Sequence, residues 1–195
     1  MSVSLDGFVA GLDQSRDQPL GVGGIRLHDW HFHPGDPAYE ASEPVRDHLL
    51  RPVGAYIMGR NMFGPVRGEW DEDWRGWWGE EPPYHAPVFV LTHYAHEPIE
   101  MKGGTTFHFV TDGFVAAHEQ ARAVAGDGDV DIAGGASAVR QGFRAGLLDE
   151  LMLDIVPVLL GAGERLLEDV GDPVLTPVEV VDSPHATHVR YRVGG

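Results

Sequence analysis

The chain has 195 residues, a length that suits one compact domain or two small ones. Thirty acidic and 14 basic residues give a formal net charge of −16, which disfavours nucleic acid and anionic lipid as partners, so a phosphate-bearing ligand needs a local positive site. The absence of cysteine excludes disulfides, thiolate metal sites and cysteine nucleophiles. No apolar run reaches the roughly 18 residues that cross a bilayer, and the first residues lack a signal-peptide pattern, so we expect a cytoplasmic protein with no membrane partner.

The first predicted elements are short and separated by polar stretches. Met1–Leu5 is apolar and predicts a short strand. The stretch from Asp6 to Asp36 is rich in Gly, Asp and Pro, and a loop of that length in a small domain is usually functional. Val45, Leu49 and Leu50 recur on one side of a predicted helix. That helix, the strand after it and the next helix start are predicted over Ala38–Pro52, Ala55–Met58 and Gly59–Phe63.

Four of the five tryptophans lie in the irregular stretch that follows, Gly64–Ala86. They recur at helical spacing within the acidic segment Glu69–Glu81, which predicts an amphipathic turn packed on the core or on a second subunit. The alternative is that this tryptophan segment forms the wall of a substrate pocket.

Strand and helix patterns alternate from residue 87 onward, and three strand-like segments close the chain. The predicted strands are Val88–Leu91, Thr106–Val110, Val130–Ala133, Glu150–Leu160, Val174–Val181 and Ala186–Val193, and the helices are Phe114–Ala125 and Ser137–Ala145. Alternating strands and helices build a parallel sheet with helices on both faces. We therefore expect an α/β fold with a mostly parallel central sheet and an antiparallel C-terminal edge, in a single domain over residues 1–195.

Five short stretches stand in order along the chain: Ser4-Leu5-Asp6-Gly7-Phe8-Val9-Ala10-Gly11, Met58-Gly59-Arg60-Asn61-Met62-Phe63, Val90-Leu91-Thr92-His93, Ile132-Ala133-Gly134-Gly135-Ala136-Ser137, and Gly146-Leu147-Leu148-Asp149-Glu150-Leu151. Together they resemble the dihydrofolate reductase-like fold, in particular the C-terminal reductase domain of the bacterial riboflavin-biosynthesis deaminase-reductase and its stand-alone relatives. The resemblance implies hydride transfer from NADPH to a small-molecule substrate and a central or near-central first strand, in which we expect Val3 and Leu5 to be buried. We also expect a homodimer.

A polyanionic cofactor needs glycines for close backbone approach, helix N-termini and an arginine. The motif Gly59-Arg60 offers these after one strand, and Gly134-Gly135-Ala136-Ser137 offers a strand-to-helix turn after another. The resemblance places the glycine pair, often joined by a cis peptide, beside the pyrophosphate and nicotinamide. The alternatives are an exposed arginine at a helix start and an ordinary tight turn.

Three residues at strand ends complete the predicted cofactor site. The resemblance places Thr92 and His93 near the adenosine ribose and its 2′-phosphate, although a Thr-His turn cap would look the same in sequence. Thr111 is a candidate on the adenine side. The preference for NADPH over NADH rests on the resemblance, Arg60, Thr92 and His93.

The substrate side is predicted to involve Asp6, beside the nicotinamide or capping its own turn, and Trp30, in a loop that covers the nicotinamide in this fold and could pack on a flat heterocycle. Ala133 stands where the riboflavin-pathway reductases often have a glutamate that helps hold the ribose-phosphate substrate. This difference weakens the inference that the present protein acts on the same substrate. Trp30 followed by Asp36 mimics the order of pterin-binding residues in a true dihydrofolate reductase, but the intervening residues do not suit a helix.

His31 and His33 alternate on one face of an extended segment, but two ligands do not make a metal site, and we predict no metal. The first hypothesis is an NADPH-dependent reductase of a pyrimidine, pterin or flavin-pathway heterocycle. The second is a nucleotide-binding protein of the same fold without efficient catalysis, suggested by the lack of an evident acid or base. A genuine dihydrofolate reductase is the third.

Overall fold

The computed structural model describes residues 1–32, 35–64, 68–70 and 73–194. The chain divides into two compact units that interleave in sequence. Unit 1 comprises Met1–Arg51 and Gly142–Gly195, and unit 2 comprises Pro52–Gln141. The second boundary between them falls inside helix α5 (Ala136–Ala145). The two halves of unit 1 therefore come from either side of unit 2 in the sequence.

Unit 2 is built on a five-stranded sheet with the order β5-β6-β4-β3-β7. Strands β6, β4, β3 and β7 run parallel, and the short edge strand β5 is antiparallel to β6. The strands are β3 (Ala55–Gly59), β4 (Pro87–Leu91), β5 (Ile99–Glu100), β6 (Thr106–Val110) and β7 (Val130–Gly134). The helical segments in the described residues of unit 2 are α3 (Arg60–Phe63), η2 (Lys102–Gly104), α4 (Gly113–Ala125) and the first part of α5.

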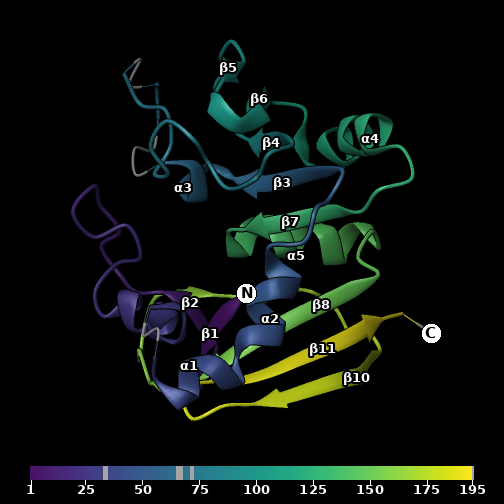
Figure 1. The fold of residues 1–195 in the computed structure, drawn as a ribbon. Coiled ribbons are helices and arrows are strands. Elements are labelled where there is room, and N and C mark those ends of the chain that lie inside the picture. The colour runs from purple at the N-terminus through teal and green to yellow at the C-terminus, as the bar shows by residue number, and fades with distance from the viewer. Residues whose placement is uncertain (33–34, 65–67, 71–72, 195) are drawn as a thin grey trace. The chain divides into compact units, whose positions relative to one another are not determined.

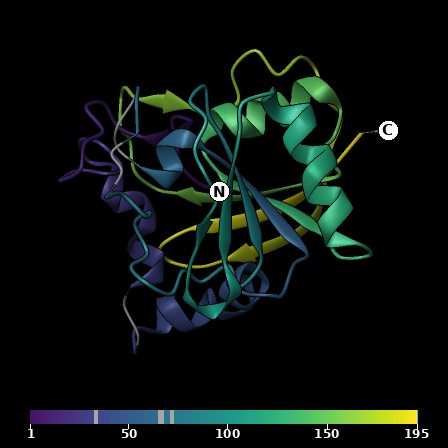
Figure 2. The same cartoon turned by 90° about the horizontal axis from the view of Figure 1, so that it is seen from above.

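The two faces of the unit 2 sheet are covered by different elements. Side chains alternate along each strand, so Met58 and Val90 share one face while Ile57 lies on the other. The first face packs against Phe63 of α3 and against the tryptophan segment, including Trp78. Helix α4 packs on β3 and β4 and buries its own small residues, and Figure 2 shows it alongside these strands. The buried strands thus read as continuous apolar runs, as parallel strands covered on both faces do.

Unit 1 contains a four-stranded sheet with the order β1-β8-β11-β10 (Figure 1). Strand β1 pairs parallel with β8, whereas β8, β11 and β10 are antiparallel to one another. The strands are β1 (Ser2–Ser4), β8 (Glu150–Val156), β10 (Leu175–Asp182) and β11 (Thr187–Val193), and a separate pair joins β2 (Phe8–Ala10) to β9 (Glu164–Arg165). The helical segments are η1 (Gly24–His31), α1 (Pro37–Ala41) and α2 (Glu43–Leu49).

The predicted α/β fold, with its mostly parallel sheet and antiparallel C-terminal strands, is confirmed, and each strand and helix predicted after residue 87 is present within a few residues. The tryptophan segment forms no helix in its described residues, but Trp70, Trp74 and Trp78 pack on the core as expected. Strands β2, β5 and β9 were not predicted because two or three residues are too few to show a period.

Two predictions about the first fifty residues are wrong. The helix expected over 38–52 is two short helices that meet at Ser42, and Leu49 and Leu50 are exposed. Strand β1 lies at the edge of its four-stranded sheet, not at the centre. Val3 is buried as predicted, but Leu5 is 66% exposed because it lies past the end of the strand.

Candidate nucleotide site

All nine residues predicted to bind the cofactor belong to unit 2 and follow the carboxyl ends of its four parallel strands. Gly59 ends β3, Thr92 follows β4, Thr111 follows β6 and Gly134 ends β7. In chain order, β4 and then β6 extend the sheet from one side of β3, and β7 then pairs with the opposite side of β3, so the direction of growth reverses there. In open parallel sheets, ligands bind beyond the carboxyl ends of the strands where this direction reverses. The topology therefore makes this edge the candidate nucleotide site.

The backbones of β3 and β7 come close together at this edge. A Cβ atom added to Gly135 would lie 3.6 Å from the Cα of Gly59. Gly134 and Gly135 have φ angles of 147° and 70°, which residues with a side chain rarely adopt. The expected cis peptide between them is not present, since this bond is trans. Glycines in this turn keep the strand ends bare, which lets a ligand approach the main chain.

Helix α5 begins directly after the glycine pair. Ala136 is buried, whereas Ser137 is exposed in the first turn, where its Oγ accepts a hydrogen bond from Gln141 Nε2 at 3.3 Å. The N–H groups of Ala138 and Val139 are already bonded to the Gly135 carbonyl. The first turn of a helix carries a partial positive charge that favours anions. The predicted placement of Ala136 and Ser137 beside a phosphate stays a prediction.

Arg60 is a cation at this edge, and it is held by Thr92 and Trp70, which are both bonded to Tyr94. Its Nη1 donates a hydrogen bond to Thr92 Oγ1 at 3.2 Å, and its Cζ lies 3.2 Å from the centre of the Trp70 ring. Thr92 Oγ1 also accepts from the Tyr94 N–H at 3.1 Å, and the Trp70 Nε1–H donates to the Tyr94 carbonyl at 2.8 Å. The sequence indicated Arg60 and Thr92, and it offered the segment of Trp70 only as a packed turn or a substrate-pocket wall. It carried no signal for Tyr94 or for the contact between Trp70 and Arg60, because only the folded chain places them together.

The charge of Arg60 has no carboxylate partner among the described residues. Its Nε is buried and makes no hydrogen bond within the described part of the chain. Burial lowers the pKa of Arg60, because a low-dielectric surrounding disfavours the charged form. An arginine still carries its charge under these conditions, so the site presents a partly buried cation whose Nε has no hydrogen-bond partner within the described residues.

Two of the residues predicted to bind the cofactor lie at the surface. His93 and Thr111 are exposed beyond the ends of β4 and β6. Thr92, by contrast, is 8% exposed and its hydroxyl is shared by the Arg60 and Tyr94 donors. Thr92 therefore also caps its own turn, which was the alternative reading of this motif.

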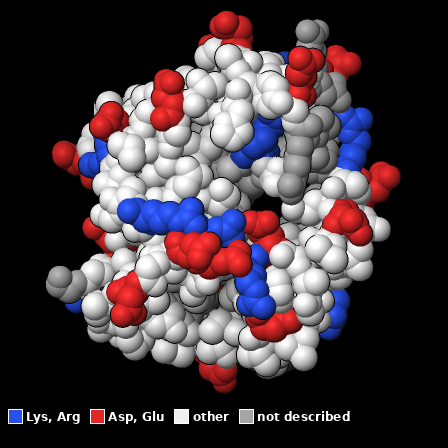
Figure 3. All heavy atoms as spheres, turned by 180° about the vertical axis from the view of Figure 1, so that it is seen from behind, with Lys and Arg blue, Asp and Glu red and all other residues white. Residues whose placement is uncertain are grey.

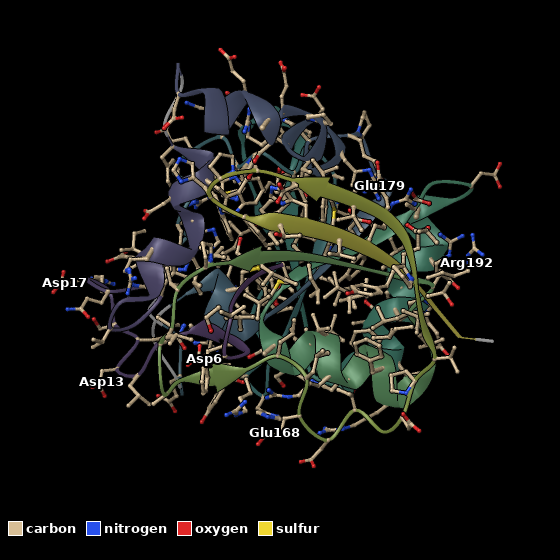
Figure 4. The ribbon with its side chains drawn as sticks, turned by 90° about the horizontal axis from the view of Figure 1, so that it is seen from below. Asp6, Asp13, Asp17, Glu168, Glu179 and Arg192 are labelled. Atoms are coloured by element: carbon tan, nitrogen blue, oxygen red, sulfur yellow. The ribbon has the colours of Figure 1, made fainter. Side chains whose placement is uncertain are left out.

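Asp6 belongs to unit 1 and anchors the loop after β8. Its carboxylate accepts hydrogen bonds from Ser4 Oγ at 2.6 Å, from the Leu160 N–H at 3.1 Å and from the Gly161 N–H at 2.7 Å. Figure 4 shows it in the turn between β1 and β2, beside β9. The Ser4 hydrogen bond and the two backbone bonds lower the pKa of Asp6 to about 2. An ionised, acceptor-only carboxylate is not suited to donate a proton at neutral pH.

The prediction that Trp30 lies open as a surface for a flat heterocycle is wrong. Its indole is 1% exposed and packs with Leu27 and Val45 in the core of unit 1. Its Nε1–H donates to Ser2 Oγ at 3.1 Å, and its ring meets the edge of His188 at 4.6 Å between centroids. Burial of this large ring stabilises the fold, so neither face is free to stack on a ligand.

Ser42, His188 and Asp154 are linked as in a serine hydrolase, but they cannot act as one. Ser42 Oγ lies 3.0 Å from His188 Nε2, and His188 Nδ1 lies 2.8 Å from Asp154 Oδ1. The three residues are between 0% and 2% exposed. A nucleophile needs contact with its substrate, so this buried chain of hydrogen bonds is structural. It ties the α1–α2 junction to β11 and β8.

Within residues 1–32, 35–64, 68–70 and 73–194, no group of three or more His, Cys, Asp or Glu side chains could hold a metal ion. His33, one of the histidines discussed above, lies outside these residues. In the same part of the chain, no helix combines the length and apolar character needed to span a membrane. Figure 3 shows acidic and basic side chains interspersed on one face of the molecule, and with a formal net charge of −16 a phosphate needs a local positive group such as Arg60.

The fold is shared with solved proteins of riboflavin biosynthesis. A putative riboflavin biosynthesis protein from Shewanella matches with a TM-score of 0.62 and 22% identity over 99% of this chain and 96% of that one. The riboflavin biosynthesis reductase of Saccharomyces cerevisiae matches with a TM-score of 0.53 and 13% identity, covering 98% of this chain and 86% of that one.

A longer protein from Thermotoga maritima, named diaminohydroxyphosphoribosylaminopyrimidine deaminase/5-amino-6-(5-phosphoribosylamino)uracil reductase, matches with a TM-score of 0.53 and 15% identity. The match covers 98% of this chain but only 54% of that one. These likenesses show the fold. No curated protein matches this chain. The family model of the RibD C-terminal domain matches residues 1–189, almost the whole sequence, and the chain therefore belongs to the RibD C-terminal domain family.

Proposed function

We propose that the protein is an NADPH-dependent reductase that transfers a hydride to a small heterocyclic substrate of pyrimidine, pterin or flavin-pathway type. Membership of the RibD C-terminal domain family supports a reductase, and solved proteins of this fold are named as reductases of riboflavin biosynthesis. The observation that carries the proposal is Arg60, a desolvated cation without a carboxylate partner in the described chain, at the carboxyl edge of a parallel sheet.

The residues at this edge fit an anionic dinucleotide. The buried Nε of Arg60 is an unsatisfied donor, and the guanidinium can pair with a phosphate. The bare glycine turn after β7 leaves room for a pyrophosphate to approach the main chain. When bound, NADPH supplies the hydride. We assign Arg60 and Thr92 to the 2′-phosphate, Gly59 and the turn Gly134–Ser137 to the pyrophosphate and nicotinamide, and His93 and Thr111 to the adenosine.

The protein's own groups limit how the substrate receives its proton. The pKa of Asp6, about 2, keeps this carboxylate ionised, so Asp6 does not donate the proton at neutral pH. We propose instead that Asp6 has a structural role, because its carboxylate fixes the main chain at Leu160 and Gly161 of unit 1. The proton then comes from solvent, so that substrate, NADPH and one proton give the reduced substrate and NADP⁺.

The structure removes the sequence feature that favoured a genuine dihydrofolate reductase. Trp30 is a core residue, and Asp36 lies 3.3 Å from His185 Nε2 within unit 1. Ala133 still argues against transferring the ribose-phosphate substrate directly, because alanine offers no hydrogen-bond acceptor. A cytoplasmic location, a homodimer and a single folding domain stay predictions.

The test is steady-state oxidation of NADPH with a panel of pyrimidine, pterin and flavin-pathway substrates, beside calorimetric titration of NADPH without substrate. Turnover with at least one pyrimidine or related heterocycle supports the reductase. Tight NADPH binding without turnover favours the nucleotide-binding protein without efficient catalysis. Failure to bind any pyridine nucleotide contradicts both, and Arg60→Ala measured in parallel shows whether binding occurs at this site.

A further inference from the structure

The guanidinium of Arg60 lies over a tryptophan that packs on the core of unit 2 and has no role in the cofactor site proposed above. Trp70 lies in the tryptophan segment, and the Arg60 Cζ is 3.2 Å from the centre of its ring. At this distance the guanidinium stacks on the indole face, which attracts a cation through its negative quadrupole. The stack restrains the plane of the guanidinium, and the plane decides in which direction its N–H groups point.

The indole is itself fixed from two sides. Its Nε1–H donates to the Tyr94 carbonyl at 2.8 Å. Its ring makes edge contacts with Phe109 of β6 at 4.6 Å and with Phe63 of α3 at 5.8 Å between centroids. A side chain held by a hydrogen bond and two aromatic edges is a rigid support, so it can fix Arg60.

Thr92 and Tyr94, which follow β4, also restrain the guanidinium. Arg60 Nη1 donates to Thr92 Oγ1, and that oxygen accepts from the Tyr94 N–H. Tyr94 thus contacts both supports, Trp70 through its carbonyl and Thr92 through its amide. The stack on Trp70 acts on a face of the guanidinium and the hydrogen bond to Thr92 acts on its edge, and together they leave few orientations to Arg60.

We propose that Trp70 is a positioning residue that holds Arg60 ready for the 2′-phosphate and thereby contributes to selectivity for NADPH over NADH. This inference rests on the proposed function. A phosphate is bound at the edge of the guanidinium plane through directed N–H groups. An arginine already held in place loses less conformational freedom on binding, so the support raises affinity only for a ligand that uses Arg60.

The experiment measures the dissociation constants of NADPH and NADH by calorimetry for the wild type, Trp70→Leu, Trp70→Phe and Trp77→Leu. Trp77 is a matched control, because it belongs to the same segment and contacts Trp74 rather than Arg60. We expect Trp70→Leu to weaken NADPH about tenfold and to change NADH less than twofold. Trp70→Phe keeps an aromatic face and should retain most of the preference, and Trp77→Leu should retain all of it.

A double-variant cycle separates positioning from general damage to the fold. In the Arg60→Ala background, Trp70→Leu should cause no further loss of NADPH affinity, because its effect passes through Arg60. Additive losses, or equal weakening of NADPH and NADH by Trp70→Leu, would overturn the positioning role. If Trp70→Leu does not fold, the same criteria apply to Trp70→Phe and its double variant, with a smaller expected loss.

Failure of the proposed function gives a different result. In that case the wild type itself binds NADPH no better than NADH, and the inference about Trp70 falls with it. A wild type that prefers NADPH, together with a Trp70→Leu variant that keeps this preference, overturns the role of Trp70 alone.

Discussion

Single residues decide how the candidate nucleotide site recognises charge. Arg60 combines a buried, unsatisfied Nε with a hydrogen bond to Thr92 and a stack on Trp70. A chain with a net charge of −16 repels a phosphate at long range, so this one desolvated guanidinium must outweigh that repulsion locally. Low surrounding dielectric strengthens the attraction once the phosphate is bound.

Arg60→Ala should weaken NADPH binding by about 1.5–3 kcal/mol, the range for a hydrogen bond to a charged group, and leave NADH nearly unchanged. Titration of both nucleotides measures the difference. Arg122→Ala is a suitable control, since Arg122 is exposed on α4 and donates to the carbonyls of Gly126 and Gly128. Equal weakening of NADPH and NADH by Arg60→Ala would mean that Arg60 contacts the shared pyrophosphate and not the 2′-phosphate.

At the scale of elements, the chain Ser42–His188–Asp154 links the α1–α2 junction to two strands. Burial alone would raise the pKa of Asp154, but the N-terminal ammonium and the His188 hydrogen bond outweigh it and lower the pKa to about 2. A carboxyl whose pKa is lower in the folded state than in the unfolded state stabilises the fold when it is ionised. That contribution is complete above the unfolded value of 3.8 and is lost as pH falls toward 2.

We therefore expect the melting temperature to fall between about pH 4 and pH 2, and Asp154→Asn to flatten this part of the profile. The lowered pKa corresponds to about 2 kcal/mol of stability in the wild type at neutral pH. Thermal unfolding followed across this range measures it. Asp127→Asn, at an exposed position, should keep the wild-type slope. An unchanged slope in Asp154→Asn would contradict the assignment.

Strand β1 allows a matched pair of substitutions. Val3 is 6% exposed within the strand and Leu5 is 66% exposed two residues later. Val3→Ala should lower the free energy of unfolding by about 1–2 kcal/mol because it removes buried apolar surface. Leu5→Ala should change it by less than about 0.5 kcal/mol. Denaturant unfolding of both variants measures the difference. Equal effects would show that the strand does not end before Leu5.

At the scale of the whole molecule, ligand binding and chain connectivity bear on stability. A ligand that binds only the folded state raises the melting temperature in proportion to its affinity. NADPH should therefore raise the melting temperature more than NADH at equal concentration. The extra shift should disappear in Arg60→Ala and persist in Arg122→Ala. Equal shifts with both nucleotides in the wild type would remove the phosphate role of Arg60.

Unit 2 is inserted between the two halves of unit 1, and α5 runs through the boundary. If unit 2 unfolded alone, a long flexible loop would join the two halves of unit 1. Closing such a loop costs conformational entropy, so unit 1 would become less stable. We predict one cooperative transition by calorimetry, in keeping with a single folding domain. Two separate transitions would contradict this prediction.

The sequence by itself determined the elements whose patterns are long and local. Apolar strands such as β3 and β4, helix α4 and the glycine turn before α5 were predicted from period and turn chemistry, because those signals lie within a few residues of each other. The placement of Gly59, Thr92, Thr111 and Gly134 at strand ends followed directly. Elements of two or three residues, such as β9, and the break at Ser42 left no such signal.

Only the tertiary structure decided which side chains meet. Trp30 looked available in an irregular loop, yet it is buried because Ser2 and His188, 28 and more than 150 residues away along the chain, close around it. The pKa of Asp6 is lowered first by the hydrogen bond from nearby Ser4 and then by backbone N–H groups of a distant loop, which only the folded chain brings to it. Trp70 and Tyr94 surround Arg60 for the same reason. Burial and hydrogen bonding depend on neighbours that are distant in sequence, and these neighbours come together only when the chain folds.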